Sequence, residues 1–301
     1  MDINGIIPIN KSRGMTSHDV VAVVRGILHT KKVGHSGTLD PNVDGVLPIC
    51  VGRATKVVDF LMSHGKVYRG SITLGFSTTT EDLDGEVVEQ KHLKKKLSDS
   101  EINHILSDMT GELIQIPPMY SAVKVKGRKL YEYARAGESV ERPKRKITVS
   151  KFIQTKPSVF DEQKQQQTIF FEVHCGKGTY VRTLAVDFGK KINMPAVMSD
   201  LTRVQSGGFS IDECITLKQL EELRDNDKLD QAIFSLERAL PQFKTINLND
   251  NQWQIVKNGG FIKLDLQEKN IKLKYNDQIQ AIYKYDDNRS LYIPKKMLLV
   301  R

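Results

Sequence analysis

The sequence predicts an α+β fold, with a large, mainly antiparallel sheet flanked by helices and a small β-rich domain at the C-terminal end. Strand-like and helix-like stretches are mixed along the chain without a strict alternating unit, which disfavours an all-parallel α/β sheet. The chain has 301 residues, 39% of them hydrophobic, which is enough to bury one large core and a smaller one.

The first elements alternate between helix and strand patterns. Ser17 is a suitable cap for a helix that runs to about His29, because apolar residues then repeat on one helical face. A short helix is expected over residues 54–62. Residues 66–75 alternate like a strand, with Tyr68 on the same face as the apolar side chains.

The rest of the large domain continues this mixture. Ser98 and Glu101 form a capping box that opens a helix ending near Met109. The further strands are expected over residues 121–125, 147–154 and 168–175, and the further helices over residues 131–137, 180–191 and, rich in charge, 217–240.

A domain boundary is expected at Pro241, where the charged helical stretch stops. Residues 1–240 then form the large domain and residues 241–301 the small one. The small domain should hold a helix over 250–258 and a hairpin whose strands are 281–285 and 290–293.

The charge of the chain favours a polyanionic partner. The formal net charge is +9 and the isoelectric point is near 9.3. Nucleic acid is the commonest partner of such a surface, because each neutralised phosphate releases counterions. A basic, solvated surface without such a partner is the alternative.

Cysteine usage and the N-terminal residues favour a cytoplasmic setting. The three cysteines are far apart and odd in number, so they predict neither a disulfide framework nor a metal site. The first five residues lack a basic stretch followed by an apolar one, and we expect no secretory leader. No apolar run is long enough for a membrane span.

The stretch from Gly34 to Pro48 is the most informative in the chain. It contains three glycines and two prolines in fifteen residues, a composition that predicts a shaped loop and no regular strand. This loop carries His35, Asp40 and Asp44. It is either an active-site loop that presents a carboxylate or a surface turn with a capping aspartate.

Three other residues have two interpretations each. Tyr68 is either packed in the core or placed at a pocket wall, where a base can stack on it. Arg182 lies in the first turn of a helix, where the dipole disfavours a cation, so it either pairs with a nearby carboxylate or faces solvent. His35 is either a turn residue or a wedge against a nucleotide.

Several separated motifs, in order along the chain, resemble those of the TruB family of tRNA pseudouridine synthases. The motifs are residues 10–17 (NKSRGMTS), 34–41 (GHSGTLDP), 45–48 (GVLP), 52–56 (GRATK), 66–69 (KVYR), 82–85 (DLDG), 116–124 (IPPMYSAVK) and 175–184 (CGKGTYVRTL). The resemblance covers residues 3–210. Thr202-Arg203 stands where the family often has two arginines after a leucine.

The resemblance implies roles for seven residues. Asp40 matches the catalytic aspartate, Tyr68 the tyrosine that stacks on the target base, and Arg182 the arginine that pairs with the aspartate. The positions that match substrate contacts are His35, Tyr180, Leu201 and Lys11.

The resemblance also implies a fold and an activity. It implies the pseudouridine synthase fold and a C-terminal PUA-like RNA-binding domain, although about 60 residues are few for a complete PUA barrel. The implied reaction converts uridine 55 in the T loop of tRNA to pseudouridine after base flipping, with no cofactor and no metal. The implied partner is the T-arm stem-loop of tRNA, bound by a monomer.

Two other classes of function stay open at the level of sequence. Asp40 and Asp44 can be the carboxylate pair of a glycosidase-like hydrolase. The chain can also be a non-catalytic RNA-binding protein that uses its basic surface and its tail, in which case Asp40 is dispensable.

Overall fold

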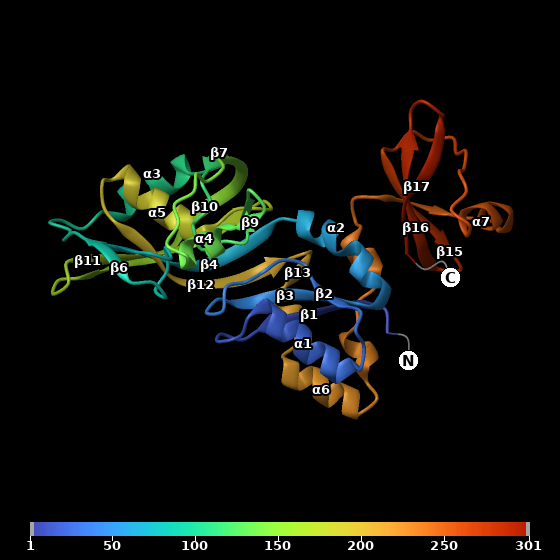
Figure 1. Ribbon diagram of the computed structural model, residues 1–301, viewed down its shortest axis with the longest axis horizontal. Coiled ribbons are helices and arrows are strands. Elements are labelled where there is room, and N and C mark those ends of the chain that lie inside the picture. The colour runs from blue at the N-terminus through green and yellow to red at the C-terminus, as the bar shows by residue number, and fades with distance from the viewer. Residues whose placement is uncertain (1–2, 299–301) are drawn as a thin grey trace. The chain divides into compact units, whose positions relative to one another are not determined.

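The computed structural model describes residues 3–298 and shows the predicted mixture of helices and strands (Figure 1). The hydrogen-bonded order of its main sheet is β1-β3-β12-β4-β11-β10-β7, with β2 beside β3 and β13 beside β12. Strand β12 pairs with β3 in parallel, whereas the pairs β12/β4, β4/β11, β11/β10 and β10/β7 are antiparallel. The sheet is therefore mixed and mainly antiparallel, as predicted.

The bounds of the nine strands are β1 (Gly5–Lys11), β2 (Val33–His35), β3 (Asp44–Val51), β4 (Lys66–Leu74), β7 (Gly111–Gln115), β10 (Arg145–Asp161), β11 (Gln166–Cys175), β12 (Ala196–Ser206) and β13 (Phe209–Ser210). The chain divides into two compact units, each described by itself below. Unit 1 consists of the segment up to Asn42, Val46–Ser63 and the segment from Gly207 onward, and unit 2 consists of Val43–Gly45 and His64–Ser206.

The first helix of unit 1 is α1 (Ser17–Leu28), whose apolar face packs on residues of β1 and β3. Its cap is Thr16 and not Ser17, so the predicted cap is wrong by one residue. The Thr16 hydroxyl accepts from the backbone N of Asp19, and the Asp19 carboxylate accepts from the backbone N of Thr16. Ser17 is buried instead and bonds to the backbone of Leu39.

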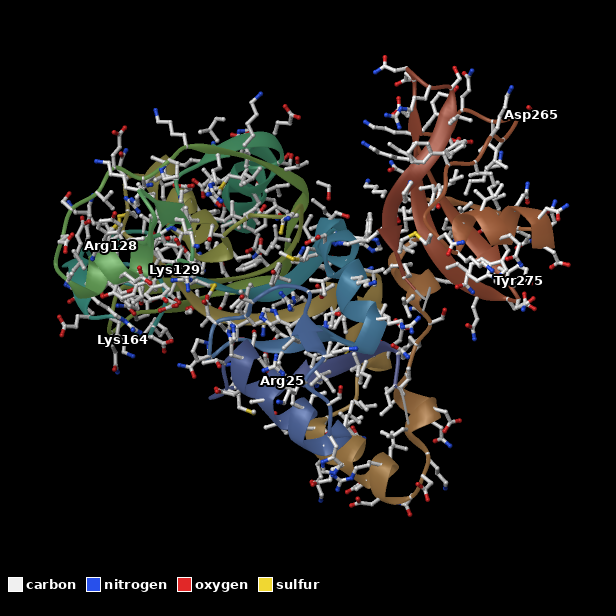
Figure 2. All side chains as sticks on the ribbon, turned by 45° about the vertical axis from the view of Figure 1, so that its right-hand side comes forward. Arg25, Arg128, Lys129, Lys164, Asp265 and Tyr275 are labelled. Atoms are coloured by element: carbon white, nitrogen blue, oxygen red, sulfur yellow. The ribbon has the colours of Figure 1, made fainter. Side chains whose placement is uncertain are left out.

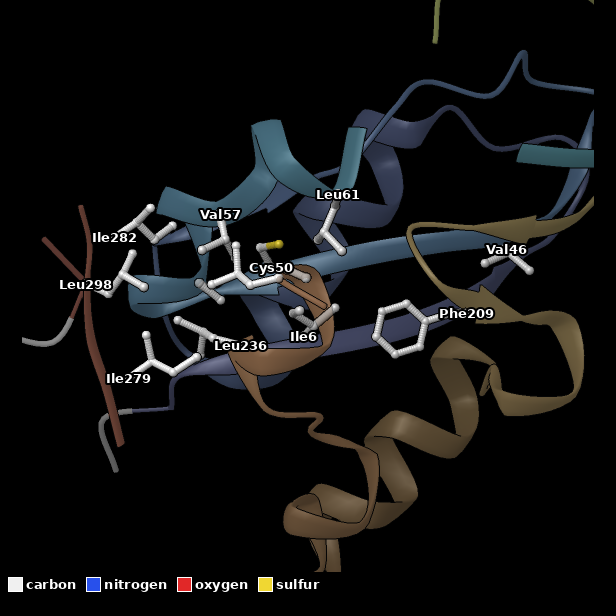
Figure 3. Close-up of a cluster of buried hydrophobic side chains, with 13 residues drawn as sticks. Ile6, Val46, Cys50, Val57, Leu61, Phe209, Leu236, Ile279, Ile282 and Leu298 are labelled. Atoms are coloured by element: carbon white, nitrogen blue, oxygen red, sulfur yellow. The ribbon is translucent and has the colours of Figure 1, made fainter. Parts of the chain in front are cut away.

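The expected helix over residues 54–62 is present in two parts, the 3₁₀ helix η1 (Gly52–Val57) and α2 (Val58–Ser63). The Thr55 hydroxyl donates to the carbonyl of Gly52 at 2.7 Å, which favours the tighter 3₁₀ turn. Val57 and Leu61 point into a buried cluster that also holds Cys50, Phe209 and Ile282 (Figure 3).

The expected helix over residues 217–240 is wrong as one element. The structure has α6 (Leu217–Asp225) followed by the 3₁₀ helices η3 (Leu229–Ala232) and η4 (Leu236–Ala239). The break falls at Asp227, whose φ of 55° is left-handed and ends a right-handed helix. The high charge and the helical spacing of residues 217–240 did not predict this left-handed residue.

The C-terminal part of unit 1 has a sheet of its own, ordered β14 (Lys244–Asn247), β15 (Asn270–Tyr275), β16 (Gln278–Asp286) and β17 (Leu291–Met297). The antiparallel pair β16/β17 confirms the predicted hairpin, and α7 (Asp250–Val256) confirms the predicted helix. Tyr275 stacks on Trp253 with ring centroids 4.8 Å apart, and Figure 2 labels Tyr275 at this sheet.

This C-terminal sheet contributes to two clusters of buried side chains. Tyr283 and Tyr292 belong to a cluster formed by residues after 241 alone. Ile279, Ile282 and Leu298 join the cluster that contains Val57 and Leu61. The sheet therefore has its own core and also packs on α2 and η1, and the expected boundary at residue 241 stays a prediction.

In unit 2, strand β4 lies between β11 and β12, and the predicted strand over residues 66–75 is confirmed. Helix α5 (Val181–Lys191) contacts β12, and α3 (Asp99–Asp108), with its predicted capping box, contacts β10 (Figure 1). The expected strands over 147–154 and 168–175 lie within β10 and β11.

The expected strand over residues 121–125 is wrong for most of its length. Only Lys124–Val125 is extended, as strand β8, which pairs with β9 (Arg128–Lys129) in a short hairpin before α4 (Leu130–Arg135). The backbone N of Ser121 instead donates to the carbonyl of Met119, so this stretch turns. No helix among residues 3–298 has the length and apolar character needed to cross a membrane.

Gly45, in the parallel pairing of β3 with β12, provides a first test of the fold. Its φ is +105°, and an added Cβ would lie 2.2 Å from the carbonyl oxygen of Arg203. Gly45→Ala should therefore lower the free energy of unfolding by about 2 kcal/mol or more. The control is Gly111→Ala, at φ +94° with no atom within 4 Å, where only the backbone strain is expected. Urea unfolding measures both, and equal losses would contradict the steric argument.

Glu172 on β11 provides a second test. Hydrogen bonds from His174 first, and from Arg69 and Lys151, lower the pKa of Glu172 from 4.5 to about 2. A carboxylate with a lowered pKa stabilises the fold above its unfolded-state pKa and stops doing so as the pH falls through its folded-state pKa.

We therefore expect Glu172→Gln to be less stable than the wild type at pH 7, with the difference shrinking between pH 4.5 and about pH 2. Urea unfolding across this range measures the difference. Glu112→Gln on β7, an exposed carboxylate, is the control. A difference that does not depend on pH would show that packing, and not charge, stabilises this position.

Candidate active site

The stretch from Gly34 to Pro48 is only partly a loop. Its two ends are strands, since β2 ends at His35 and β3 begins at Asp44, so the prediction that no strand occurs in this stretch is wrong. Gly45 accommodates the close backbone of β12, and the Pro48 carbonyl accepts from the backbone N of Ser36 at 3.1 Å. Both residues serve strand pairing, and the loop proper is confined to residues 36–43.

The backbone is anchored on both sides of Asp40, by residues of unit 1. On one side, the Ser17 hydroxyl accepts from the backbone N of Leu39 at 2.9 Å and donates to its carbonyl at 3.3 Å. On the other side, the carbonyl of Pro41 accepts from the backbone N of Gly14 at 3.0 Å. Asp40 is thus half-buried on a backbone whose path is set by its neighbours.

Lys11 completes this anchoring. It is fully buried, and its Nζ donates to the carbonyls of Ser12, Met15 and Pro41 at 3.0, 2.7 and 3.0 Å. A buried ammonium needs such partners, because an unpaired charge away from water is strongly unfavourable. The structure therefore places Lys11 beneath the loop that carries Asp40.

His35 lies at the end of β2, where it pairs with Ile49 of β3. Its Nδ1 accepts from the backbone N of Gly37 at 3.2 Å, and its ring meets the ring of His18 edge-on at 5.4 Å. The imidazole is half-exposed. These contacts orient the ring at the start of the loop.

Arg182, in unit 2, is buried in the first turn of α5, so the solvent-facing alternative is wrong. Its Nη1 donates to the carbonyl of Thr80 at 2.8 Å and its Nη2 to the carbonyl of Tyr120 at 3.0 Å. Its Nε lies 3.7 Å from Oδ2 of Asp82. The predicted nearby carboxylate is therefore present in the form of Asp82.

The residues around Thr80 hold the start of α5 at a second point. The hydroxyl of Thr183 donates to the carboxylate of Glu81 at 2.7 Å, and Glu81 has a left-handed φ of 66°. Burial raises the pKa of Glu81, and the hydrogen bond from Thr183 offsets part of this rise. A left-handed, partly buried glutamate is a strained residue that its surroundings must maintain.

Tyr180 precedes α5 and is positioned by Gln115, the last residue of β7. The Gln115 side chain accepts from the backbone N of Tyr180 at 2.8 Å and donates to its carbonyl at 3.0 Å. Gln115 is almost fully buried. Because both ends of the amide are used, the backbone at Tyr180 has a defined position from which its half-exposed ring extends.

Tyr68 and Leu201 lie on the neighbouring strands β4 and β12, and both are buried. Leu201 pairs with Gly70, and Tyr68 pairs with Arg203. A Cβ at Gly70 would lie 2.2 Å from the carbonyl of Asp200, so glycine allows this close approach of β4 and β12. Core packing and a place at a pocket wall are both compatible with Tyr68.

The paired strands β4 and β12 also carry two buried cations, Lys66 and Arg203. The pKa of Lys66 is lowered to about 8, mainly by burial and secondly by repulsion from Arg203. Lys66 pairs with Ser206 across β4 and β12, and its Nζ donates to the carbonyl of His64 at 3.2 Å.

Asp44 has a structural partner. Its Oδ1 accepts from the hydroxyl of Thr202 at 2.6 Å, at the position where Asp44 and Thr202 pair in the sheet. Thr202 stands where the family often has an arginine, and here it joins β12 to the start of β3. This bond favours a structural role for Asp44, at the start of β3.

Sequence reasoning missed the positioning roles of five residues, which are Thr80, Glu81, Asp82, Gln115 and Tyr120. Asp82 and Tyr120 lie within two of the motifs, residues 82–85 and 116–124, and Glu81 and Gln115 lie directly beside them. The available signal was the position of the motifs, because most of these contacts use backbone carbonyls that no side-chain pattern reveals. Among residues 3–298, no group of three His, Cys, Asp or Glu side chains is suited to a metal ion.

Comparison with known proteins agrees with the resemblance of the motifs. Residues 25–181 match the model of the TruB family pseudouridylate synthase (N terminal domain), and residues 182–241 match the tRNA pseudouridylate synthase B C-terminal domain. The tRNA pseudouridine synthase B of Pediococcus pentosaceus is 71% identical over 99% of this chain and 100% of its own length. That of Ligilactobacillus salivarius is 54% identical over 98% of this chain and 99% of its own length.

Solved structures show the same fold. A chain from the "Crystal Structure of a Cbf5-Nop10-Gar1 Complex" aligns with a TM-score of 0.72 and 25% identity, over 99% of this chain and 85% of that chain. A chain from the "Crystal structure of the archaeal box H/ACA sRNP Nop10-Cbf5 complex" aligns with a TM-score of 0.71 and 24% identity, over 99% and 87%. With matching family models and relatives along its whole length, this chain belongs to the TruB family of tRNA pseudouridine synthases.

Proposed function

We propose that this chain converts uridine 55 in the T loop of tRNA to pseudouridine, with Asp40 as the reacting carboxylate. The observation that carries the proposal is the anchoring of Leu39 and Pro41, which sets the backbone on both sides of Asp40. A carboxylate held in one position lowers the entropic part of a reaction barrier. The family membership supplies the class of substrate.

The reaction moves one bond and leaves the composition of the RNA unchanged. The C1′–N1 bond breaks, the uracil turns, and a C1′–C5 bond forms, so there is no net oxidation and no co-substrate. Asp40 either attacks C1′ as a nucleophile or removes a ribose proton to give a glycal intermediate. In both routes an ionised carboxylate is required, and the C5 proton must leave at the end.

The other proposed residues surround this chemistry. Arg182 pairs with the Asp40 carboxylate and keeps it charged, in an orientation set by the carbonyls of Thr80 and Tyr120. Tyr68 stacks on the target base and assists removal of the C5 proton. Tyr180 and Leu201 contact the substrate, and these contacts stay predictions.

Lys11 and His35 act from the loop side. We predicted a substrate contact for Lys11, and its three carbonyl bonds support in addition a role in positioning the loop. His35 fills the space that the flipped uridine leaves, for which its half-exposed ring at the end of β2 is suited. Base flipping costs a few kcal/mol of lost stacking, which the contacts to the extruded base must offset.

The proposed partner is the T-arm stem-loop, bound by a monomer in the cytoplasm. Its phosphates contact basic residues, among them the exposed Lys31, Lys32, Lys124, Lys126 and Arg128 and the half-buried Lys129. Figure 2 shows Arg128 and Lys129 close together on the hairpin β8/β9. Residues 241–301, with their own buried core, are proposed to be a short PUA-like RNA-binding domain.

The competing functions differ in what they require of the two aspartates. A glycosidase-like mechanism needs Asp44 as much as Asp40, yet the Asp44 carboxylate is bonded to Thr202 in the sheet. A non-catalytic RNA-binding protein needs neither carboxylate. One assay for pseudouridine and for free uracil in a defined T-arm RNA separates the three functions.

Asp40→Asn should abolish pseudouridine formation on an unmodified T-arm stem-loop, lowering turnover by at least ~10³-fold, because the amide is neither a nucleophile nor a base. RNA binding should stay nearly unchanged. The matched control is Asp44→Asn, whose amide oxygen can still accept from Thr202 and which should retain turnover. Normal turnover of Asp40→Asn would refute the assignment, and equal losses in both variants would favour a carboxylate pair.

Tyr68→Phe should retain RNA binding and lose turnover, because the ring still stacks while the hydroxyl is gone. Single-turnover kinetics with a radiolabelled stem-loop measures the rate, and filter binding measures the affinity. Thermal unfolding checks that the buried position still packs. Unchanged turnover would reduce Tyr68 to a packing residue of β4.

A further inference from the structure

A cavity of about 310 Å³ lies in unit 2, away from every residue assigned above. One wall is the segment after β6 (Val87–Gln90), which contributes Lys91, Leu93, Lys94 and Lys95. The other wall is the turn after α5, which contributes Ile192 and Met194. The lysine-rich run of residues 91–96 has no role in the proposed reaction.

The cavity is preformed, although residues 91–97 belong to no helix or strand. The backbone N of Leu93 donates to the carbonyl of Gln165 at 2.9 Å. The side chain of Gln167 bonds to both backbone groups of Leu97 at 2.8 Å, and Nζ of Lys91 reaches across to the carbonyl of Asn193 at 2.7 Å. The Lys91 bond joins the two walls, and the other bonds fix the segment to β11 and the turn before it, so a ligand need not order the segment.

The floor of the cavity is apolar and its rim is cationic. Leu93 is buried, and Ile192 and Met194 are half-buried. Lys94 and Lys95 are exposed, and within residues 3–298 neither forms a salt bridge, although Lys95 is near enough to Glu101 to contribute to the lowered pKa of that carboxyl. None of the residues that line the cavity is acidic, and His92 adds an exposed ring at the edge.

An apolar floor beneath exposed lysines matches the two parts of a nucleotide, a flat base and a phosphate. Extruded bases pack their faces on aromatic or apolar side chains, while lysines neutralise the phosphates. The volume is at the lower end of the range for small-ligand pockets, which suits one nucleotide and excludes a duplex.

The cavity lies at the opposite end of α5 from Arg182. Helix α5 has eleven residues, which corresponds to about 16 Å along its axis. A nucleotide in the cavity is therefore a different one from the target uridine, whose proposed partners include Arg182.

We propose that this cavity binds one unpaired nucleotide of tRNA outside the T arm, with the base on Leu93, Ile192 and Met194 and the phosphates on Lys94 and Lys95. The proposal rests on tRNA as the substrate, as given under the proposed function. It commits to a contact that an isolated T-arm stem-loop does not make, which the test below decides. A free mononucleotide has the same chemistry and is separated by the test.

The test compares two variants and a control on two RNAs. The double variant Lys94→Gln/Lys95→Gln removes the cationic rim, and Ile192→Trp fills the cavity while keeping the lysines. The control, Lys218→Gln/Lys228→Gln, makes the same charge change at exposed positions on or after α6, a helix rich in acidic residues. Dissociation constants are measured for unmodified full-length tRNA and for the T-arm stem-loop, at several salt concentrations.

We expect the rim variant to weaken tRNA binding about tenfold at low salt and to reduce the slope of log K against log salt by one to two. Ile192→Trp should weaken tRNA binding several-fold with an unchanged slope, because no phosphate contact is lost. Both variants should bind and modify the T-arm stem-loop as the wild type does, which also shows that they fold. The control variant should bind both RNAs with the affinity of the wild type.

Three results would overturn the proposal. The first is an unchanged tRNA affinity in both variants. The second is a loss of affinity that is equally large for the stem-loop, or equally large in the control variant. In the third, adenosine 5′-monophosphate binds the wild type but not Ile192→Trp, and the tRNA affinity of the variant is unchanged. That result would assign the cavity to a free nucleotide. Failure of the proposed function looks different, since the wild type would then form no pseudouridine in the stem-loop.

Discussion

A buried ammonium group holds the loop on which the proposed chemistry depends. Nζ of Lys11 donates to three backbone carbonyls, one of them that of Pro41, directly after Asp40. Away from water these bonds are strong, and breaking them leaves an unpaired charge, so the loop has one low-energy path. The Ser17 hydroxyl does the same for Leu39 from the start of α1. Two polar side chains thus define the backbone around one carboxylate.

The same principle operates in unit 2 with a guanidinium. Arg182 is buried, and its orientation comes from the carbonyls of Thr80 and Tyr120 and from the carboxylate of Asp82. A planar guanidinium has donors in fixed directions, so partners from separate loops fix its rotation as well as its position. Further hydrogen bonds fix these segments, from the hydroxyl of Thr183 to the carboxylate of Glu81 and from the side chain of Gln115 to the carbonyl of Tyr180. Backbone carbonyls therefore link segments that are 62 to 102 residues apart in the sequence.

The distribution of basic residues suits an enzyme that modifies a large RNA. A tRNA extends well beyond the nucleotide that reacts, and phosphate contacts far from that nucleotide add affinity without taking part in the chemistry. The basic hairpin β8/β9, the C-terminal sheet and the cavity beside the 91–96 run are separate places for such contacts. The cavity differs from the other two because an apolar floor lies beneath its lysines.

Local patterns along the chain were sufficient to predict the class of fold, most of the regular elements and, through the motifs, the family. Strand β4, the hairpin β16/β17 and the capping box of α3 follow from local periodicity and short-range hydrogen bonds, which a stretch of sequence contains in full. Local patterns failed to predict the structure at positions whose conformation depends on a residue distant in the sequence. Ser17 is drawn away from the cap by Leu39, and Gly45 and Pro48 lie in a strand because β12 and Ser36 pair with them. No local pattern predicts that Lys11 and Arg182 are buried among carbonyls or that Asp44 is bonded to Thr202, because burial depends on contacts between residues far apart along the chain.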